Sequence, residues 1–317
     1  MQSRPPNILS GPYLDRAGHR RKDEARVREA LADPATLFVP VWQTRNSIVR
    51  NGELLTAHMV AGAHAFAGID PSEFVLLGEF RGQLCFAVGL SGEHPQITQP
   101  PVEFHDLRLI AGELPADEAG VLAYARAMIH WRANHRFCGR CGAPTIAADG
   151  GHVLHCSNEA CRLQQFPRTD PAVIVLITDG ERALLGRQAT WPPGRYSTIA
   201  GFVEPGESLE DAVVREVREE TGIEVATVHY HSSQPWPFPS SLMLGFTAHA
   251  ASTEILLTDD ELEDARWLTR AELAGGAVAL PTTHSISFRL IEDWYDSGAD
   301  RPLRQEPGVR MWQLPRR

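Results

Sequence analysis

Three glutamates close together in one predicted helix constrain this chain more than any other feature of its sequence. The helix is predicted to begin after Ser208, which can cap its first turn, and to end at Gly222. Glu216, Glu219 and Glu220 stand at positions i, i+3 and i+4, so their side chains project as a cluster from one side of the helix.

The carboxylates continue the apolar stripe of the same helix. At about 100° per residue, Glu216 and Glu220 point within about 20° of Leu209, and Val213 belongs to the same stripe. A stripe of this kind faces the protein body, where like charges repel and buried carboxylates are costly unless something pairs them. Divalent cations are the economical explanation, because hard oxygen ligands suit Mg²⁺ or Mn²⁺ bridging to phosphate. The alternative is a solvated acidic helix face.

Four of the five cysteines form a second constraint, with the spacing Cys138-x2-Cys141-x14-Cys156-x4-Cys161. Four thiolates in two close pairs suit one tetrahedral structural zinc and leave no coordination position open for chemistry. The alternative is four free thiols. In the helix predicted just before the cluster, His130 and the following His135 are interpreted as surface residues in preference to spare metal ligands.

Three segments organise the chain. Residues 1–115 contain short strand-like runs with turn signals, including the hairpin turn RNGEL, and indicate an α+β sheet domain without a chemical motif. Residues 116–166 hold a predicted linker helix and the cysteine cluster. Residues 167–317 mix strands and helices without strict alternation, which indicates an α/β sandwich. The predicted fold class is therefore α+β.

The net charge of -10 bears on the partners of the chain. An acidic surface argues against loose binding to nucleic acid or to anionic membranes, although metal ions can bridge acidic side chains to a nucleotide. We find no signal-peptide pattern and no apolar run long enough to span a membrane. The expected location is therefore cytoplasmic.

The stretch from Gly201 to Ile223 resembles the Nudix box, G-x5-E-x7-R-E-U-x-E-E-x-G-U, in which U is apolar. Every fixed position matches: Gly201, Glu207, Arg215, Glu216, Val217, Glu219, Glu220, Gly222 and Ile223. The resemblance implies a Nudix α/β/α sandwich whose loop–helix–loop holds metal against a diphosphate. It further implies metal ligation by Glu216 and Glu220, with Glu219 in the same cluster, and a structural pair between Arg215 and Glu207.

A proline-rich segment, SQPWPFPSS, runs from Ser233 to Ser241. Prolines at alternate positions fix an extended backbone, which would present two aromatic side chains rigidly. Such rings stack on flat bases or on a nicotinamide, and neighbouring polar groups can supply hydrogen bonds. The residues concerned are Gln234, Pro235, Trp236, Pro237, Phe238, Pro239, Ser240 and Ser241. The alternative is a loop that packs its aromatic residues inward.

This segment resembles the signature of NudC-type NADH pyrophosphatases, which also carry an N-terminal domain and a four-cysteine zinc ribbon before the Nudix domain. The resemblance implies that residues 234–241 line the substrate pocket and that family members are homodimers whose active sites draw on both subunits. It adds Glu261 and the backbone carbonyl of Ala200 as metal ligands. It implies further substrate contacts through Phe166, Phe202, Trp236 and Ser287.

The resulting expectation is metal-dependent hydrolysis of NADH or NAD⁺ to AMP and nicotinamide mononucleotide. Glu216, Glu219 and Glu220 are the candidate catalytic residues, and the sequence does not choose between Glu219 and Glu220 for activating water. Removal of the NAD cap from RNA is an alternative that uses the same bond. An alternative of another class is a zinc-ribbon interaction protein with an inactive Nudix domain.

Overall fold

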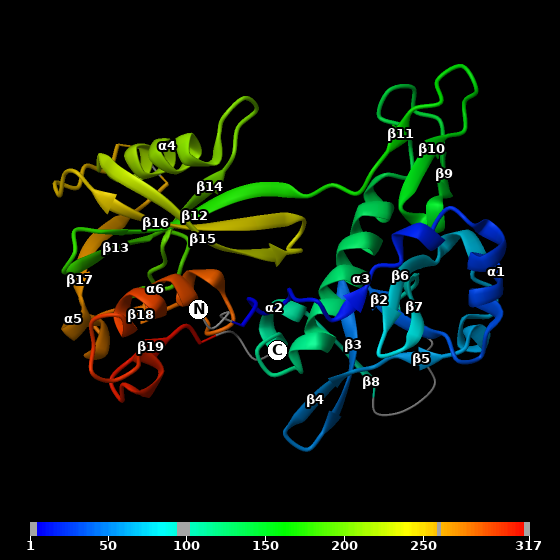
Figure 1. Cartoon of the computed structure of the whole chain (residues 1–317), viewed down its shortest axis with the longest axis horizontal. Coiled ribbons are helices and arrows are strands. Elements are labelled where there is room, and N and C mark those ends of the chain that lie inside the picture. Colours follow the sequence, from blue (N-terminus) through cyan, green and yellow to red (C-terminus); the bar gives the residue numbers. More distant parts are fainter. Residues whose placement is uncertain (1–4, 94–101, 259–260, 314–317) are drawn as a thin grey trace. The chain divides into compact units, whose positions relative to one another are not determined.

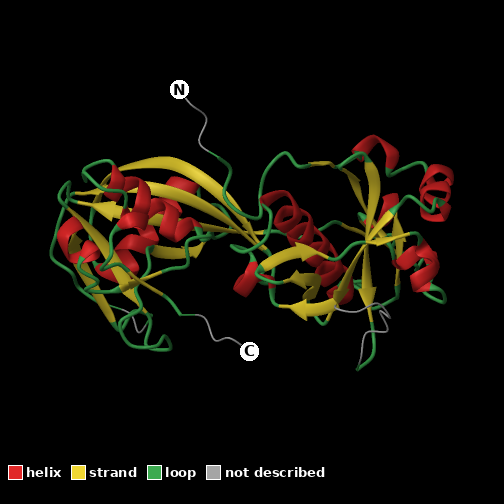
Figure 2. Cartoon of the chain, turned by 90° about the horizontal axis from the view of Figure 1, so that it is seen from below, coloured by secondary structure: helices red, strands yellow, loops and turns green. Residues whose placement is uncertain are grey.

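The computed structural model describes residues 5–93, 102–258 and 261–313. The chain divides into two compact units, each of which combines one large sheet with helices (Figures 1 and 2). The N-terminal unit runs to Thr169 and also includes Pro235–Ser240. The C-terminal unit consists of Asp170–Gln234 and the chain from Ser241 onwards.

The N-terminal unit is built on an eight-stranded sheet with the order β1-β6-β7-β2-β3-β4, in which β5 pairs with β2 and β8 pairs with β3. Its strands are β1 (Leu14–Asp15), β2 (Leu37–Trp42), β3 (Arg45–Asn51), β4 (Leu54–Ala57), β5 (Val60–Ala61), β6 (Val75–Phe80), β7 (Gln83–Leu90) and β8 (Val102–His105). The predicted turn between residues 51 and 54 is confirmed, since it joins β3 to β4 with Gly52 at φ 64°. The helices are α1 (Glu24–Ala32), α2 (Leu107–Ile110) and α3 (Ala116–Asn134).

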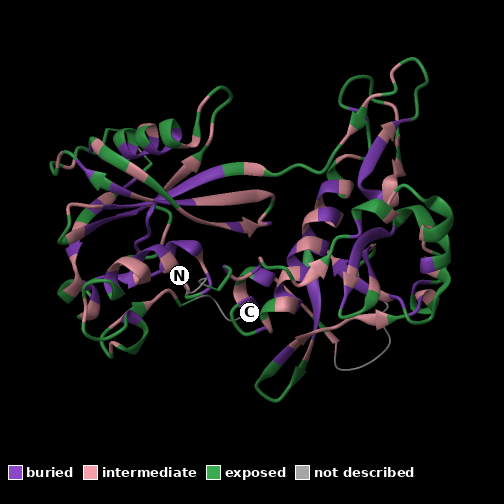
Figure 3. Ribbon diagram, in the orientation of Figure 1, coloured by how far each residue is buried: buried purple, intermediate pink, exposed green. Residues whose placement is uncertain are grey.

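Helix α3, which the sequence suggested as a linker, is part of the core of this unit. It lies against β2, β6 and β7, and its inner side is buried along its length (Figure 3). Leu122, Ala125 and Met128 share one apolar cluster with Val39 and Leu77 of the sheet. The helix is therefore held by its packing on strands far away in the sequence.

The zinc-ribbon segment forms a small antiparallel sheet of β9 (Thr145–Ala148), β10 (Val153–Cys156) and β11 (Gln164–Gln165).

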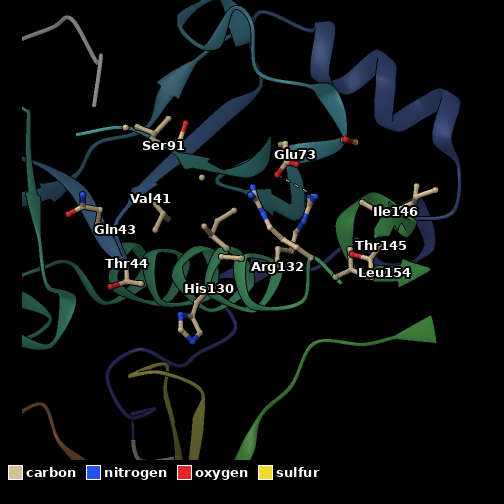
Figure 4. Close-up of a pocket in the computed structure, with 18 residues that line it drawn as sticks. Val41, Gln43, Thr44, Glu73, Ser91, His130, Arg132, Thr145, Ile146 and Leu154 are labelled. Carbon is tan, nitrogen blue, oxygen red and sulfur yellow. Dashed lines mark ion pairs between the residues drawn. The ribbon is translucent and has the colours of Figure 1, made fainter. Parts of the chain in front are cut away.

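A cavity of about 670 Å³ is lined by residues of β2, β7, α3, β9 and β10 (Figure 4). In this cavity Arg132 forms an ion pair with Glu73 at 3.6 Å. All of its lining residues belong to the N-terminal unit, whereas the glutamate helix belongs to the other unit.

The C-terminal unit is a sandwich around a six-stranded sheet of order β15-β16-β12-β13-β17, with β14 paired to β12. Its elements are β12 (Asp170–Thr178), β13 (Arg182–Arg187), β14 (Ile199–Phe202), α4 (Leu209–Thr221), β15 (Val225–Trp236), β16 (Ser241–Ala250), β17 (Asp264–Thr269), α5 (Arg270–Ala274), β18 (Ala279–Leu280), α6 (Ile286–Asp296) and β19 (Arg310–Met311). Short 3-10 turns occur at Gly18–Arg20, Ala63–Phe66, Pro71–Glu73, Asp149–Gly151 and Leu303–Gln305.

Alternate residues of β12 serve the two faces of this sheet. Val173 and Val175 pack in one cluster with Val213 of α4, whereas Ile174 packs in another cluster with Phe288 of α6. The predicted α/β/α sandwich is confirmed, and the sheet carries the glutamate helix on one of its faces. Among the residues that the structure describes, no helix combines the length and apolarity needed to cross a bilayer.

Candidate metal and substrate site

The ends of α4 follow directly from the sequence. Ser208 accepts a hydrogen bond from the backbone N–H of Asp211, and the Asp211 side chain bonds back to the cap residue in a capping box. At the other end Gly222 adopts φ 71°, a left-handed conformation that favours glycine. A side chain there would also meet Leu256, because an added Cβ would lie 2.8 Å from the Leu256 Cβ. Both predicted caps are confirmed.

The helix buries two of its three glutamates. Glu216 is 8% exposed and Glu220 is 3% exposed, so both continue the buried stripe as predicted. The Glu219 side chain is 55% exposed and lies at the rim of the cluster. Two carboxylates thus lie where a bare negative charge is costly, and a third remains accessible to water.

Gly201 of β14 makes room for one of the buried carboxylates. A Cβ atom at this position would lie 1.9 Å from Cδ of Glu216, far inside van der Waals contact. Only glycine therefore lets the Glu216 carboxylate rest against the strand backbone. Ala200, whose carbonyl was suggested as a metal ligand, precedes Gly201 in the same strand.

Arg215 joins the loop before the helix to the glutamates. Its Nε donates to one oxygen of Glu207 at 2.6 Å, and its Nη2 donates to the other oxygen at 2.9 Å. Its Nη1 reaches both Glu216 and Glu219 at 2.9 Å, and Nη2 also donates to the Phe202 carbonyl. The predicted pair of Arg215 and Glu207 is confirmed. These hydrogen bonds from Arg215, followed by one from the Glu204 backbone, lower the pKa of Glu207 to about 2.

Burial is the main influence on Glu216 and raises its pKa, whereas the neighbouring Arg215 lowers it. The charges of Glu261 and Glu219 raise it further. Glu216 and Glu220 are buried and Glu261 is exposed, and carboxylates that disfavour each other's charge suit a hard divalent cation. Among the described residues, the four cysteines are the group whose donor atoms converge as a metal site, so metal ligation by Glu216, Glu220 and Glu261 stays a prediction.

The four cysteines converge in the zinc-ribbon segment, where their Sγ atoms all lie within 4.8 Å of one another. The Sγ atoms of Cys138 and Cys161 are 3.8 Å apart, and those of Cys141 and Cys156 are 3.4 Å apart. Tetrahedral zinc with Zn–S bonds of about 2.3 Å needs sulfur atoms about 3.8 Å apart, so the cluster fits.

Backbone N–H groups of Arg140, then of Cys141, lower the pKa of Cys138 to about 7, which favours the thiolate that binds metal. His130 and His135 lie outside the cluster, and both are half-buried. His135 hydrogen-bonds to the Trp131 carbonyl, and His130 lines the cavity beside α3.

The proline-rich segment divides between the two units. The Gln234 carboxamide is fully buried, donating to the His284 carbonyl and accepting from the N–H of Ile286, both at 2.8 Å. It therefore holds the start of α6. Trp236 and Phe238 pack partly buried against the core of the N-terminal unit, edge to face at 5.0 Å.

The remaining predicted residues differ widely in exposure. Ser287 is 4% exposed, and its hydroxyl hydrogen-bonds with the hydroxyls of Ser197 and Thr198, so its side chain has a structural role. Phe202 and Phe166 are each 60% exposed, the former in β14 next to Gly201 and the latter just after β11 in the N-terminal unit. Ser241 begins β16, directly after Ser240.

Three family models match consecutive parts of the chain. Residues 35–131 match an NADH pyrophosphatase-like rudimentary NUDIX domain, residues 133–166 an NADH pyrophosphatase zinc ribbon domain, and residues 168–293 a NUDIX domain. The NAD-capped RNA hydrolase NudC of Stutzerimonas stutzeri (strain A1501) is 42% identical over 232 residues, which cover 73% of this chain and 81% of that protein. The chain belongs to the NudC-type NADH pyrophosphatases of the Nudix superfamily.

Longer proteins share the same core with this NudC-type chain. The NAD-capped RNA hydrolase NUDT12 of Macaca fascicularis is 46% identical over 197 residues, and the match covers 57% of this chain but only 43% of that protein. Nudix hydrolase 19, chloroplastic, of Arabidopsis thaliana is 49% identical over 170 residues, covering 51% of this chain and 39% of that protein. The zinc-ribbon match, together with the converged thiols, supports a structural zinc in this chain.

One residue at the proline-rich segment escaped the sequence analysis. Arg126 of α3 donates a hydrogen bond from Nη1 to the Pro237 carbonyl. Helical spacing could have indicated that Arg126 is buried, because it lies four residues after the apolar Leu122 and three before Ile129, on the side of the helix that faces inward.

Proposed function

We propose that this NudC-type protein hydrolyses the pyrophosphate bond of NADH or NAD⁺, releasing AMP and nicotinamide mononucleotide, with Mg²⁺ or Mn²⁺ as its metal. The observation that carries the proposal is the pair of buried carboxylates on α4, one of which rests against Gly201. Arg215 offsets part of the charge at Glu216, and a divalent cation would offset the charge of the group further. Family membership makes the pyrophosphate of a dinucleotide the natural target.

We assign different roles to the buried and the exposed glutamates. Glu216, Glu220 and Glu261 would hold the metal, with the Ala200 carbonyl as a further ligand. The bound ion would neutralise charge on the phosphates and lower the pKa of the attacking water. Glu219 reaches solvent at the rim, so it is our first candidate for orienting or deprotonating that water, and Glu220 is the second. Arg215 holds Glu216 and Glu219 in place through its Nη1.

The substrate contacts beyond the phosphates are part of the proposal. Phe202 offers an exposed aromatic face next to Gly201, and we propose that it stacks on the nicotinamide. The resemblance to NudC-type enzymes implies a stacking contact for Trp236 as well. Phe166, Ser287 and residues 234–241 are proposed as further substrate contacts, and the protein is proposed to be a homodimer. For Gln234 this contribution is indirect, because its carboxamide already bonds to backbone at residues 284 and 286.

Removal of an NAD cap from RNA is a second candidate, favoured by the names of the relatives from Stutzerimonas stutzeri and Macaca fascicularis. The bond cleaved is the same, so the two candidates differ only in whether an RNA chain is attached to the adenosine. Competition between NAD-capped RNA and free NADH on one preparation separates them. The ratio of the two kcat/KM values decides which substrate the protein prefers.

The metal-site assignment is tested by Glu216→Gln, Glu219→Gln and Glu220→Gln with NADH and Mn²⁺, identifying products by chromatography. Losing a metal ligand should lower kcat/KM by more than the roughly 10- to 100-fold that follows loss of an outer-shell partner. Glu216→Gln and Glu220→Gln should also need more Mn²⁺, whereas Glu219→Gln should lower kcat at an unchanged Mn²⁺ requirement. Wild-type turnover in all three variants would refute the assignment.

A further inference from the structure

Arg126 is a buried cation that contacts the proline-rich segment and also feels the charge of Asp106. The residue is 7% exposed, and its Nη1 donates to the carbonyl of Pro237. Within the described residues no ion pair joins Arg126 to a carboxylate, and its Nε makes no hydrogen bond. Arginine stays protonated in proteins, so this charge must be compensated by what surrounds it.

The same guanidinium also lies over an aromatic ring of the segment. Its central carbon is 4.7 Å from the ring centre of Phe238, within the range of a cation–π interaction. Phe238 in turn meets Trp236 edge to face at 5.0 Å. One side chain of α3 therefore contacts both the backbone and an aromatic ring of the segment, and reaches Trp236 through that ring.

The prolines leave the segment with few backbone donors of its own, one of which is the Phe238 N–H that bonds to the Trp236 carbonyl. Pro235, Pro237 and Pro239 have no N–H to donate, and residues 237–240 lie outside the paired strands, because β15 ends at Trp236 and β16 begins at Ser241. A carbonyl between prolines then needs a donor from elsewhere in the protein. Arg126 supplies that donor to Pro237 from a helix 111 residues earlier in the chain.

We infer that Arg126 is a positioning residue, through which the N-terminal unit holds residues 235–240 and sets the placement of Trp236 and Phe238. This gives α3 a part in substrate binding, although Arg126 itself does not contact the dinucleotide. The consequence for catalysis rests on the proposed function, because it assumes that Trp236 contacts the nicotinamide. The consequence for the backbone of the segment does not.

Arg108 provides a matched control on the same ring. Its central carbon lies 5.6 Å from the ring centre of Phe238, but its side chain is 53% exposed and pairs with Asp106 at 2.6 Å. Arg108→Gln therefore removes a cation from this ring and leaves the contact with the Pro237 carbonyl in place. A general loss of positive charge near Phe238 would affect both arginine variants alike.

The test compares Arg126→Gln, Arg126→Lys and Arg108→Gln with the wild type. In Arg126→Gln the KM for NADH should rise on the order of tenfold, the effect of one lost charge-assisted hydrogen bond, with kcat within about twofold. Arg126→Lys should recover part of the loss, and Arg108→Gln should leave KM unchanged. Hydrogen–deuterium exchange of a peptide spanning residues 233–241 should be faster in Arg126→Gln and unchanged in Arg108→Gln.

These readouts separate the inference from the proposed function. If the wild type releases no AMP from NADH, the proposed function fails, and the exchange measurement still decides whether Arg126 holds the segment. If the wild type is active but Arg126→Gln changes neither KM nor exchange, the inference is overturned. Should Arg126→Gln fail to fold, as judged by thermal unfolding and zinc content, Arg126→Lys decides on the same two readouts. Wild-type values in that variant would overturn the inference.

Discussion

At the scale of single residues, the site depends on Glu216, whose carboxylate is buried where its negative charge is disfavoured. Burial raises the pKa of Glu216, and the charges of Glu261 and Glu219 act in the same direction against the hydrogen bond from Arg215. Gly201 permits this placement, since a Cβ atom there would overlap the carboxylate. The residue is therefore suited to binding a cation more than to stabilising the fold by itself.

This raised pKa makes a prediction about stability and pH in the metal-free protein. A carboxyl with a raised pKa in the folded state favours folding below the unfolded-state pKa of about 4.3, and this contribution is lost as pH rises through the folded-state value. Glu216→Gln should therefore match the wild type near pH 4 and unfold at a higher temperature than the wild type near pH 8, with about 2–4 °C expected for each kcal/mol.

Thermal unfolding with and without Mg²⁺ checks this prediction. Added Mg²⁺ should raise the midpoint of the wild type and leave that of Glu216→Gln almost unchanged, because the variant lacks a ligand. Equal stabilisation of both proteins by Mg²⁺ would contradict the role of Glu216 as a metal ligand.

At the scale of secondary-structure elements, α4 and the loop before it act as one piece. The helix is capped at both ends, and the two-pronged pair of Arg215 with Glu207 ties its middle to the preceding loop. Arg215 also bonds to the Phe202 carbonyl at the end of β14. The Arg215 guanidinium thus connects the strand, the loop and the helix, and it contacts both Glu216 and Glu219.

Breaking this pair should weaken catalysis without touching a proposed metal ligand. Glu207→Gln keeps the shape but removes the charge, so NADH turnover should fall on the order of tenfold, as for other hydrogen bonds to charged groups. Because the pKa of Glu207 is about 2, the wild-type pair persists through the whole neutral and mildly acidic range. Glu210→Gln, on an exposed position of the same helix, is the control and should retain wild-type turnover.

At the scale of the whole molecule, the chain has two units with separate cores. The N-terminal unit contains the NUDIX-like domain and the zinc ribbon, and the C-terminal unit contains the Nudix domain. The zinc-ribbon segment has small strands and belongs to the N-terminal unit, whose large core contains α3. Leu154 of this segment packs into the N-terminal core, and a zinc held by the four thiolates would add to its stability. The C-terminal unit has its own two apolar clusters on either side of the sheet.

Zinc removal should therefore act on one unit. A chelator, or Cys138→Ser, should remove about one zinc per chain and lower the unfolding midpoint of the N-terminal unit, leaving that of the C-terminal unit in place. Metal analysis and calorimetry measure both effects. Cys85→Ala is the control: this thiol is buried in the N-terminal core, where burial raises its pKa to about 12, and its loss should leave zinc content unchanged. A single transition that shifts as a whole would contradict the prediction.

The sequence alone determined the features whose parts lie close together along the chain. The caps of α4, the burial of Glu216 and Glu220, the hairpin turn at Gly52 and the cysteine cluster all follow from local spacing, because helical periodicity, turn geometry and ligand number act over a few residues. Fold class followed from the same patterns.

Only the tertiary structure decided which distant groups meet. It placed α3 on the N-terminal sheet, and it set the Gln234 carboxamide on the start of α6, some 50 residues further along. It also brought Arg126 to the Pro237 carbonyl. Composition and periodicity showed that these side chains face inward or carry polar groups. Their partners depend on how whole elements pack, because a buried polar group is satisfied by whatever lies beside it in space.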